Sequence, residues 1–163
     1  MNGVLELVGG MRFLPEECSR MPEAAPVEVT VALDGADGCI ADARDQTSKF
    51  LTRVRGEWGL PVSARTRDLG QLVVSELVTN ALKYAPGPAL LRLSIREGML
   101  EIEVWDSDPT LPLARAADAG RVGQHGLEIV MAVVQGFEAR RESVGKRITA
   151  RLTLSNGGPN LPD

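Results

Sequence analysis

The sequence predicts an α+β fold, a two-layer sandwich in which helices cover one face of a mixed, mostly antiparallel β-sheet. Segments with strand-like alternation and segments with helical periodicity follow one another along the 163 residues. Short turn sequences join the later strand segments in pairs, as in hairpins. The length suits one domain with a real hydrophobic core, and helices on one face of such a sheet bury it in two layers.

The first half of the chain contains one strand segment and two helical segments. Residues 27–33 alternate apolar and polar side chains with period two, which is typical of a half-buried strand. In residues 37–58 apolar side chains recur at three- and four-residue steps, which predicts an amphipathic helix. Ser63 is a suitable N-cap for a second helix over residues 63–84, which the Pro-Gly-Pro sequence after it ends.

The second half contains two hairpins separated by a loop and a helix. Residues 90–96 and 99–106 alternate around a Glu-Gly turn, which predicts a hairpin. A polar segment rich in small residues fills 107–124, and a connection of that length usually has a function. Residues 126–134 predict a short apolar helix. Residues 137–142 and 147–154 predict a second hairpin, which turns at Val144-Gly145-Lys146.

These elements predict one domain over residues 27–154. Residues 1–26 hold three prolines and an acidic pair, and we expect a flexible leader or a docking arm. Residues 155–163, with the sequence SNGGPNLPD, are expected to form a flexible tail.

Composition and charge exclude several classes of protein. A hydrophobic fraction of 44% and a charged fraction of 25% are typical of a globular domain. The net charge of −4 argues against direct nucleic-acid binding, and no apolar segment is long enough to span a membrane. Cys18 and Cys39 form no CxxC pair, so we expect reduced thiols in a cytoplasmic protein. One histidine in the chain argues against a histidine-rich metal site.

The sequence SELVTNALKYA places three chemically useful side chains along one helix face. Glu76 and Asn80 are four residues apart, and Lys83 follows one turn later. A carboxylate orients or deprotonates a hydroxyl, and an amide oxygen is a suitable Mg²⁺ ligand. The alternative is a solvated helix face with an ordinary Glu–Lys arrangement.

Two further segments carry ligand-binding features. In VWDSDP, Asp106 ends a strand, where its carboxylate could accept a hydrogen bond from the exocyclic amine of a base; a turn-forming aspartate is the alternative. In GRVGQHGLEIV, glycines precede a helix whose N-terminal N–H groups would face an anion; a glycine-capped flexible loop is the alternative. The segment lacks GxxxxGK[ST], so it is not a Walker A phosphate loop.

In order and spacing, these three segments resemble the N, G1 and G2 boxes of the Bergerat-type ATP-binding fold. Gyrase, the large heat-shock chaperone, histidine kinases and MutL-type repair proteins share that fold. The wording of SELVTNALKYA, VWDSDPTLP and GQHGLEIV is similar to the small bacterial anti-sigma factor serine/threonine kinases and their actinobacterial relatives. The resemblance covers about residues 27–154.

The resemblance implies ATP and Mg²⁺ as ligands and gives four residues a role. Glu76 would be the catalytic base or water-orienting carboxylate. Asn80 would bind Mg²⁺, and Lys83 would lie near the phosphates. Asp106 would contact the adenine amine.

The resemblance also implies a lid over the phosphates. Gly123 and Gly126 would belong to this lid, and Leu127 would begin its helix. His125, between the two glycines, is interpreted as a solvated loop residue, with a phosphate contact as the alternative.

The sequence departs from the family pattern in two places. Asp108 and Thr110 stand where the second box usually carries glycines. Arg147 stands where the family often places a threonine that supports the adenine site. Thr149 is the nearest threonine, and alternation puts it on the same strand face as Arg147, so it is the candidate substitute in the nucleotide site.

The favoured function is an anti-sigma factor-type serine/threonine protein kinase. It would bind a sigma factor or a similar target, phosphorylate a small antagonist protein, and form a homodimer through its first strand and helix. The alternative is a catalytically weak or inactive nucleotide-binding or protein-association module of the same fold. A self-contained sensor histidine kinase needs an acceptor histidine on a dimerisation helix, and His125 lies in the lid segment instead.

Overall fold

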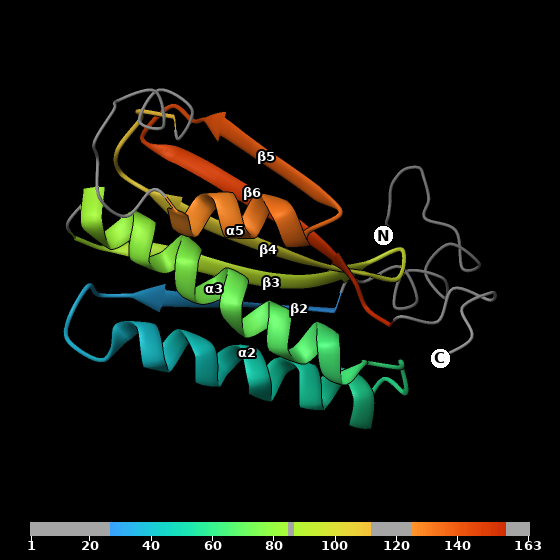
Figure 1. Ribbon diagram of the computed structural model, residues 1–163. Helices are drawn as coiled ribbons and strands as arrows, with labels where there is room; N and C mark the ends of the chain where they lie inside the picture. Colours follow the sequence, from blue (N-terminus) through green and yellow to red (C-terminus); the bar gives the residue numbers. More distant parts are fainter. Residues whose placement is uncertain (1–26, 85–86, 112–124, 156–163) are drawn as a thin grey trace, which may run out of the picture.

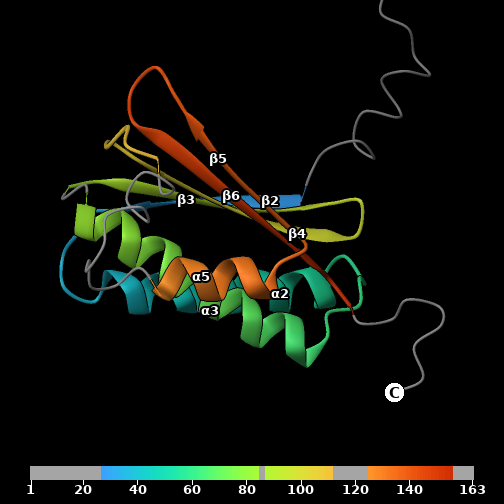
Figure 2. The same ribbon diagram turned by 45° about the horizontal axis from the view of Figure 1, so that its top comes forward.

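Three helices cover one face of a five-stranded sheet in the part of the chain that the structure, a computed structural model, describes (Figure 1). That part comprises residues 27–84, 87–111 and 125–155. The predicted leader of residues 1–26 and residues 156–163 of the predicted tail lie outside it. Figure 2 shows the two layers from a second direction, with the helices on one side of the strands. The predicted α+β sandwich is confirmed.

The sheet has the order β2-β3-β4-β6-β5, and every pair of neighbours in it is antiparallel. Two hairpins, β3–β4 and β5–β6, form where the sequence predicts them, and they meet along β4 and β6. The strands are β2 (Val27–Leu33), β3 (Ala89–Arg96), β4 (Met99–Asp106), β5 (Gly136–Arg141) and β6 (Lys146–Thr153).

The helices are α2 (Cys39–Gly56), α3 (Ala64–Tyr84) and α5 (His125–Val133). Ser63 caps α3 as predicted, because its Oγ accepts a hydrogen bond from the backbone N–H of Thr66 at 2.9 Å. Among the described helices, none combines the length and apolar character that crossing a bilayer requires.

The core lies between the helices and the covered face of the sheet. Helix α3 is central, since it packs against α2 and α5 and contacts strands β3, β4 and β6. Period-two alternation sends every second strand residue toward the helices. The fully buried large side chains include Leu51, Leu77, Leu91, Leu93, Leu100, Ile102, Ile148 and Leu152.

Shortening a central α3 side chain should destabilise the domain. Leu77 is fully buried, so Leu77→Ala should lower the free energy of unfolding by about 2–5 kcal/mol, the cost of lost burial and a cavity. Urea denaturation followed by circular dichroism measures this loss. The control is Thr79→Ala on the exposed side of the same helix, which should change stability by about 0.5 kcal/mol or less. Equal effects of the two substitutions would contradict the described burial of α3.

Candidate functional site

Helix α3 directs Glu76 toward the first turn of α5. Leu77 and Ala81 are buried in the core, and Glu76 and Asn80 precede them by one position, on a half-buried side of the helix. A Cβ atom added at Gly126 of α5 would collide with the Glu76 Oε1 atom and lie 3.2 Å from its Cδ. The structure therefore brings together Glu76 and Gly126, two residues predicted for the site from segments 50 residues apart in the sequence.

Asn80 carries a buried polar atom that lacks a partner. Its side-chain Nδ2 is buried and has no hydrogen-bond partner among the described residues. A buried donor left unpaired costs about 1–3 kcal/mol, so native structures normally satisfy such groups. A phosphate oxygen or a metal-bound water would accept from this amide, and its carbonyl oxygen is a hard ligand suited to Mg²⁺. Asn80 therefore fits the phosphate and metal end of a nucleotide site.

The other residues predicted around the phosphates are placed as follows. Lys83 lies exposed in the last turn of α3. Leu127 follows Gly126 in α5 and is half-buried against the core. The helix begins at His125, two residues before the predicted start of the lid helix at Leu127. Gly123 lies outside the described residues.

Asp106 forms a buried ion pair at the end of β4. Its cross-strand neighbour is Lys146, the first residue of β6. The Lys146 Nζ lies 3.0 Å from Asp106 Oδ1, and the two side chains are 0% and 1% exposed. Lys146 also donates a hydrogen bond to the backbone carbonyl of Asp108 at 3.1 Å, and Asp106 Oδ1 accepts from the Asp108 N–H at 2.9 Å. The carboxylate predicted to receive a base is thus covered by an ammonium group.

Sequence reasoning missed Lys146, which stands in the predicted turn of the second hairpin. A signal was present in the chain. Since alternation places Arg147 and Thr149 on one face of β6, Lys146 belongs to the other face together with the apolar Ile148. A charged residue in a row of core positions indicates a buried partner.

The structure corrects the prediction for Thr149. Lys146 pairs with Asp106 in register and shares its face, so Thr149 lies on the opposite face of the sheet, away from the helices. It is buried there beside its cross-strand neighbours Glu103 and Glu138. Thr149 is therefore not brought to Asp106 and cannot support a base bound at that carboxylate.

The face of the sheet that points away from the helices carries a network of ion pairs. Arg92 and Arg147 both bind Glu103, at 2.7 and 2.9 Å, and Arg151 binds Glu101 at 2.9 Å. Burial works against the charge of Arg147, but its bonds to glutamates, Glu103 foremost, outweigh burial and raise the pKa of its guanidinium. This face has a cavity of about 340 Å³. Four arginines, three glutamates and Thr149 line this cavity, and ion pairs join the arginines to the glutamates.

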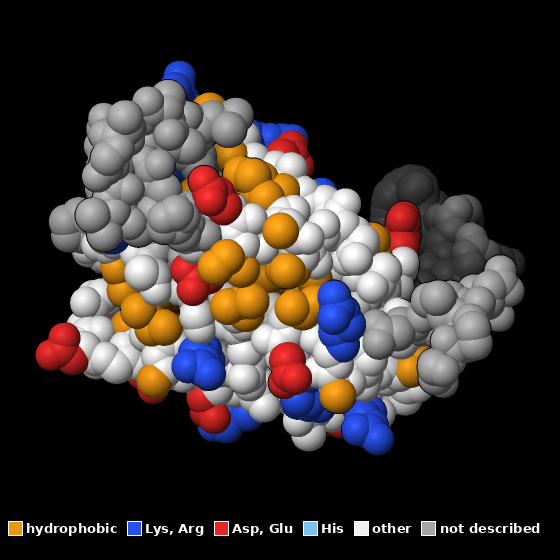
Figure 3. Space-filling model, viewed as in Figure 1, with side chains coloured by type: hydrophobic (Ala, Val, Ile, Leu, Met, Phe, Trp, Pro, Cys, Tyr) orange, Lys and Arg blue, Asp and Glu red, His pale blue; other side chains and the backbone are white. Residues whose placement is uncertain are grey.

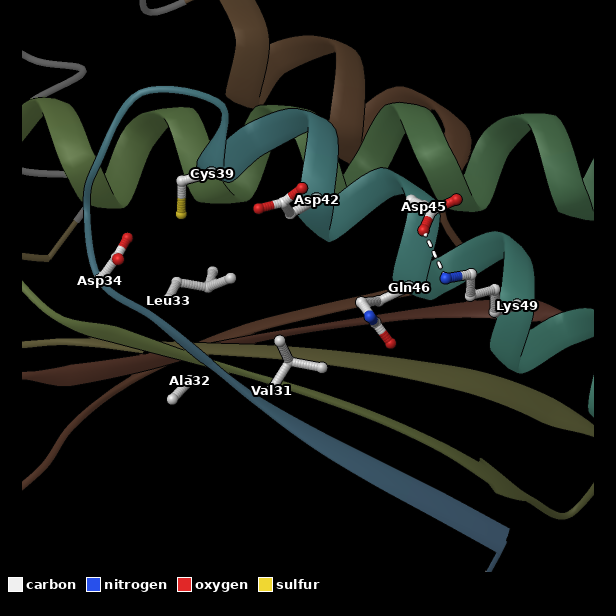
Figure 4. A pocket seen from close by; sticks show the side chains of 9 residues that line it. All are labelled: Val31, Ala32, Leu33, Asp34, Cys39, Asp42, Asp45, Gln46 and Lys49. Carbon is white, nitrogen blue, oxygen red and sulfur yellow. Dashed lines mark ion pairs between the residues drawn. The ribbon is translucent and has the colours of Figure 1, made fainter.

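A second cavity of about 470 Å³ lies between β2 and the first half of α2 (Figure 4). Three aspartates line it, and one of them, Asp45, pairs with Lys49 at 3.0 Å. Cys39 lines it as a buried free cysteine, whereas Cys18 lies outside the described residues. The described residues contain no group of histidine, cysteine and carboxylate side chains that could hold a metal. None of the residues predicted for the nucleotide site lines this cavity.

Comparisons with known proteins concern the fold and the family of the chain. Residues 40–152 match the family model described as the histidine kinase-like ATPase domain. None of the curated proteins compared with the chain matches it significantly.

Two solved structures align with this chain, and the first of them has a similar fold. The crystal structure of the RsbU and RsbW domains of Rv1364c from Mycobacterium tuberculosis aligns over 80% of this chain, with 17% identity and a TM-score of 0.56. The histidine kinase domain of the blue-light activated histidine kinase from Erythrobacter litoralis EL346 aligns over 69%, with 18% identity and a TM-score of 0.46. This chain spans 33% and 61% of the lengths of the two structures.

In the β5–β6 turn, Gly145 lies close to the backbone of Asp106, so a larger residue there should destabilise the domain. Gly145 has φ 78°, and a Cβ there would collide with the Asp106 carbonyl oxygen and lie 2.9 Å from Ser107 Cα. Gly145→Ala should therefore cost about 3 kcal/mol or more, from backbone strain and overpacking together. Thermal and urea unfolding measure the loss.

The matched control is Gly98, a turn glycine with φ 76° and nothing within 4 Å of its added Cβ. Gly98→Ala should cost about 1–2 kcal/mol, the backbone strain alone. Equal costs for the two substitutions would show that Gly145 does not rest against the main chain of β4.

Proposed function

The chain belongs to the histidine kinase-like ATPase domain family, and on that basis we propose that it is an ATP-binding regulatory protein kinase of the anti-sigma factor type. It would bind a sigma factor and phosphorylate a serine or threonine of a small antagonist protein. The observation that carries the proposal is the close approach of the Glu76 side chain to Gly126, one helical turn from Asn80. The buried Nδ2 atom of Asn80 has no hydrogen-bond partner among the described residues.

The proposed nucleotide lies with its phosphates at the α3–α5 junction. Asn80 holds Mg²⁺ through its amide oxygen, and Lys83 lies near the phosphates. The glycines before α5, Gly123 and Gly126, let the backbone come close to the phosphate oxygens. Asp106 is the acceptor for the base amine, and Leu127 anchors the lid helix in the core.

The proposed reaction is transfer of the γ-phosphoryl group to a hydroxyl. The hydroxyl oxygen of the target forms a new bond to the γ-phosphorus, and the bond from that phosphorus to the β–γ bridging oxygen breaks. Glu76 takes the hydroxyl proton, and ADP and a phosphorylated serine or threonine result. When bound, Mg²⁺ neutralises charge on the phosphate oxygens.

The outer surface of the helices supports the proposal that the chain binds other proteins. Figure 3 shows hydrophobic side chains gathered over α5 and the middle of α3. Ile129 and Met131 of α5 are 44% and 41% exposed. Contiguous exposed apolar surface is typical of protein–protein contacts. A sigma factor, an antagonist or a second copy of the chain would cover such a surface.

One observation favours the second candidate function, a protein-association module that binds nucleotide weakly or not at all. The Asp106 carboxylate is 1% exposed and is bound by Lys146, so it does not face an open base pocket. The two functions differ in their demand for nucleotide, which the following measurements separate.

Calorimetric titration with Mg-ATP tests the nucleotide site. We expect binding that Asn80→Ala weakens by about tenfold or more, since the variant removes the metal ligand. Thr79→Ala, its exposed neighbour on α3, is the control and should bind as the unchanged protein does. Absence of binding at millimolar Mg-ATP would reject the kinase in its simple form and favour the association module.

Phosphotransfer to a panel of small antagonist proteins tests the catalytic role. Glu76→Gln keeps the shape of the side chain but cannot take a proton. It should lower the transfer rate by about 10²–10⁴-fold and leave Mg-ATP affinity within about threefold. An unchanged rate would remove Glu76 from the chemistry.

A further inference from the structure

Lys146 is a fully buried lysine in a domain that has only three lysines. Lysines are almost never fully buried unless they are paired. The pair with Asp106 connects the first residue of β6 to the last residue of β4 inside the sandwich. Neither the proposed phosphate site nor the proposed chemistry uses Lys146.

The ammonium group makes contacts of the kind that the amino group of a base would make. It donates to Asp106 Oδ1 at 3.0 Å and to the Asp108 carbonyl at 3.1 Å. The same Oδ1 accepts the Asp108 N–H at 2.9 Å, which fixes the orientation of the carboxylate. The Lys146 ammonium group therefore already donates a hydrogen bond to the Asp106 carboxylate. Because both side chains are buried, a base cannot reach this carboxylate while the ammonium group stays in place.

We propose that Lys146 occupies the base-amine position on Asp106, so that a nucleotide binds only by displacing the lysine ammonium from this carboxylate. The inference rests on the proposed function, which assigns Asp106 to the base. The observed affinity is then the intrinsic affinity multiplied by the fraction of molecules in which the lysine has moved away. Lys146 thus lowers the observed affinity of the site for a nucleotide.

A path for the displaced ammonium is available. An unpaired ammonium cannot stay buried without a large cost in free energy. Lys146 follows the β5–β6 turn, where Val144 is 63% exposed. The four-carbon stem of a lysine can remain against apolar neighbours while its head reaches water near this turn.

Because the chain has three lysines, the NMR signal of the Lys146 ammonium group can be followed in the unaltered protein. The side chain of Lys49 is 66% exposed, and Lys83 is exposed as well. With ¹⁵N-labelled lysine, the buried ammonium should give a slowly exchanging NMR signal, which Lys146→Arg should remove. Saturating Mg-ATP should abolish or shift this signal. Mg-tripolyphosphate, which has phosphates but no base, should leave it unchanged.

A variant measures the strength of the competition. Lys146→Met keeps an unbranched side chain, one heavy atom shorter, without the charge, and it should bind Mg-ATP about tenfold more tightly than the unchanged protein. Lys49→Met is the matched control and should not alter the affinity. If Lys146→Met fails to fold, as judged by its thermal unfolding, the NMR titration of the unaltered protein decides the question alone.

The outcomes separate this inference from the proposed function. Mg-ATP binding with the Lys146 signal unchanged would overturn the inference and leave the nucleotide site standing. Binding by Lys146→Met but not by the unchanged protein would support both. Loss of the signal on binding, together with tighter binding by the variant, would also support both. No Mg-ATP binding by either protein would overturn the proposed function and the inference with it.

Discussion

Burial of α3 against the sheet is the interaction on which the other features of the domain depend. The helix contacts α2 on one side, α5 on the other, and β4 beneath. Because Leu77 and its apolar neighbours face the sheet, the preceding position on the helix, Glu76, faces α5. The rotation of α3 about its axis is therefore fixed by hydrophobic packing, and this rotation decides which polar side chains meet the first turn of α5. The polar residues do not hold the helix in place; the core does.

Local patterns in the sequence predicted most of the fold. Ser63 caps α3, and the Glu-Gly turn joins β3 to β4, because capping and tight turns depend on neighbouring residues. The position of Thr149 relative to Asp106 depended instead on the register between β4 and β6, whose paired residues are 40 to 54 positions apart. The Asp106–Lys146 pair depends on the same register. Glu76 and Asn80 were found from helical spacing, whereas the contact of Glu76 with Gly126 needed the packing of α3 on α5.

The two ends of the candidate site differ in their electrostatics. At the proposed phosphate end, the Asn80 Nδ2 atom has no hydrogen-bond partner among the described residues, and Lys83 adds positive charge nearby in the sequence. At the base end, Asp106 and Lys146 form a neutral pair that is satisfied within the protein. A buried pair of this kind costs desolvation when it forms, and separating it costs more, because each ion would be left uncompensated. If the domain binds a nucleotide as proposed, recognition of its phosphates and recognition of its base would thus be separable.

The position of β2 at the edge of the sheet has a consequence for assembly. Among the described strands, β2 has one neighbour, β3, so a strand of another molecule could add to its outer backbone groups. β5 forms the other edge of the described sheet, and there Arg140 pairs with Glu138 at 2.6 Å, so charge alone does not set the two edges apart. Antiparallel pairing of β2 with β2 of another molecule would have twofold symmetry and would occupy the same edge in both molecules. It would therefore give a closed dimer rather than an open fibre.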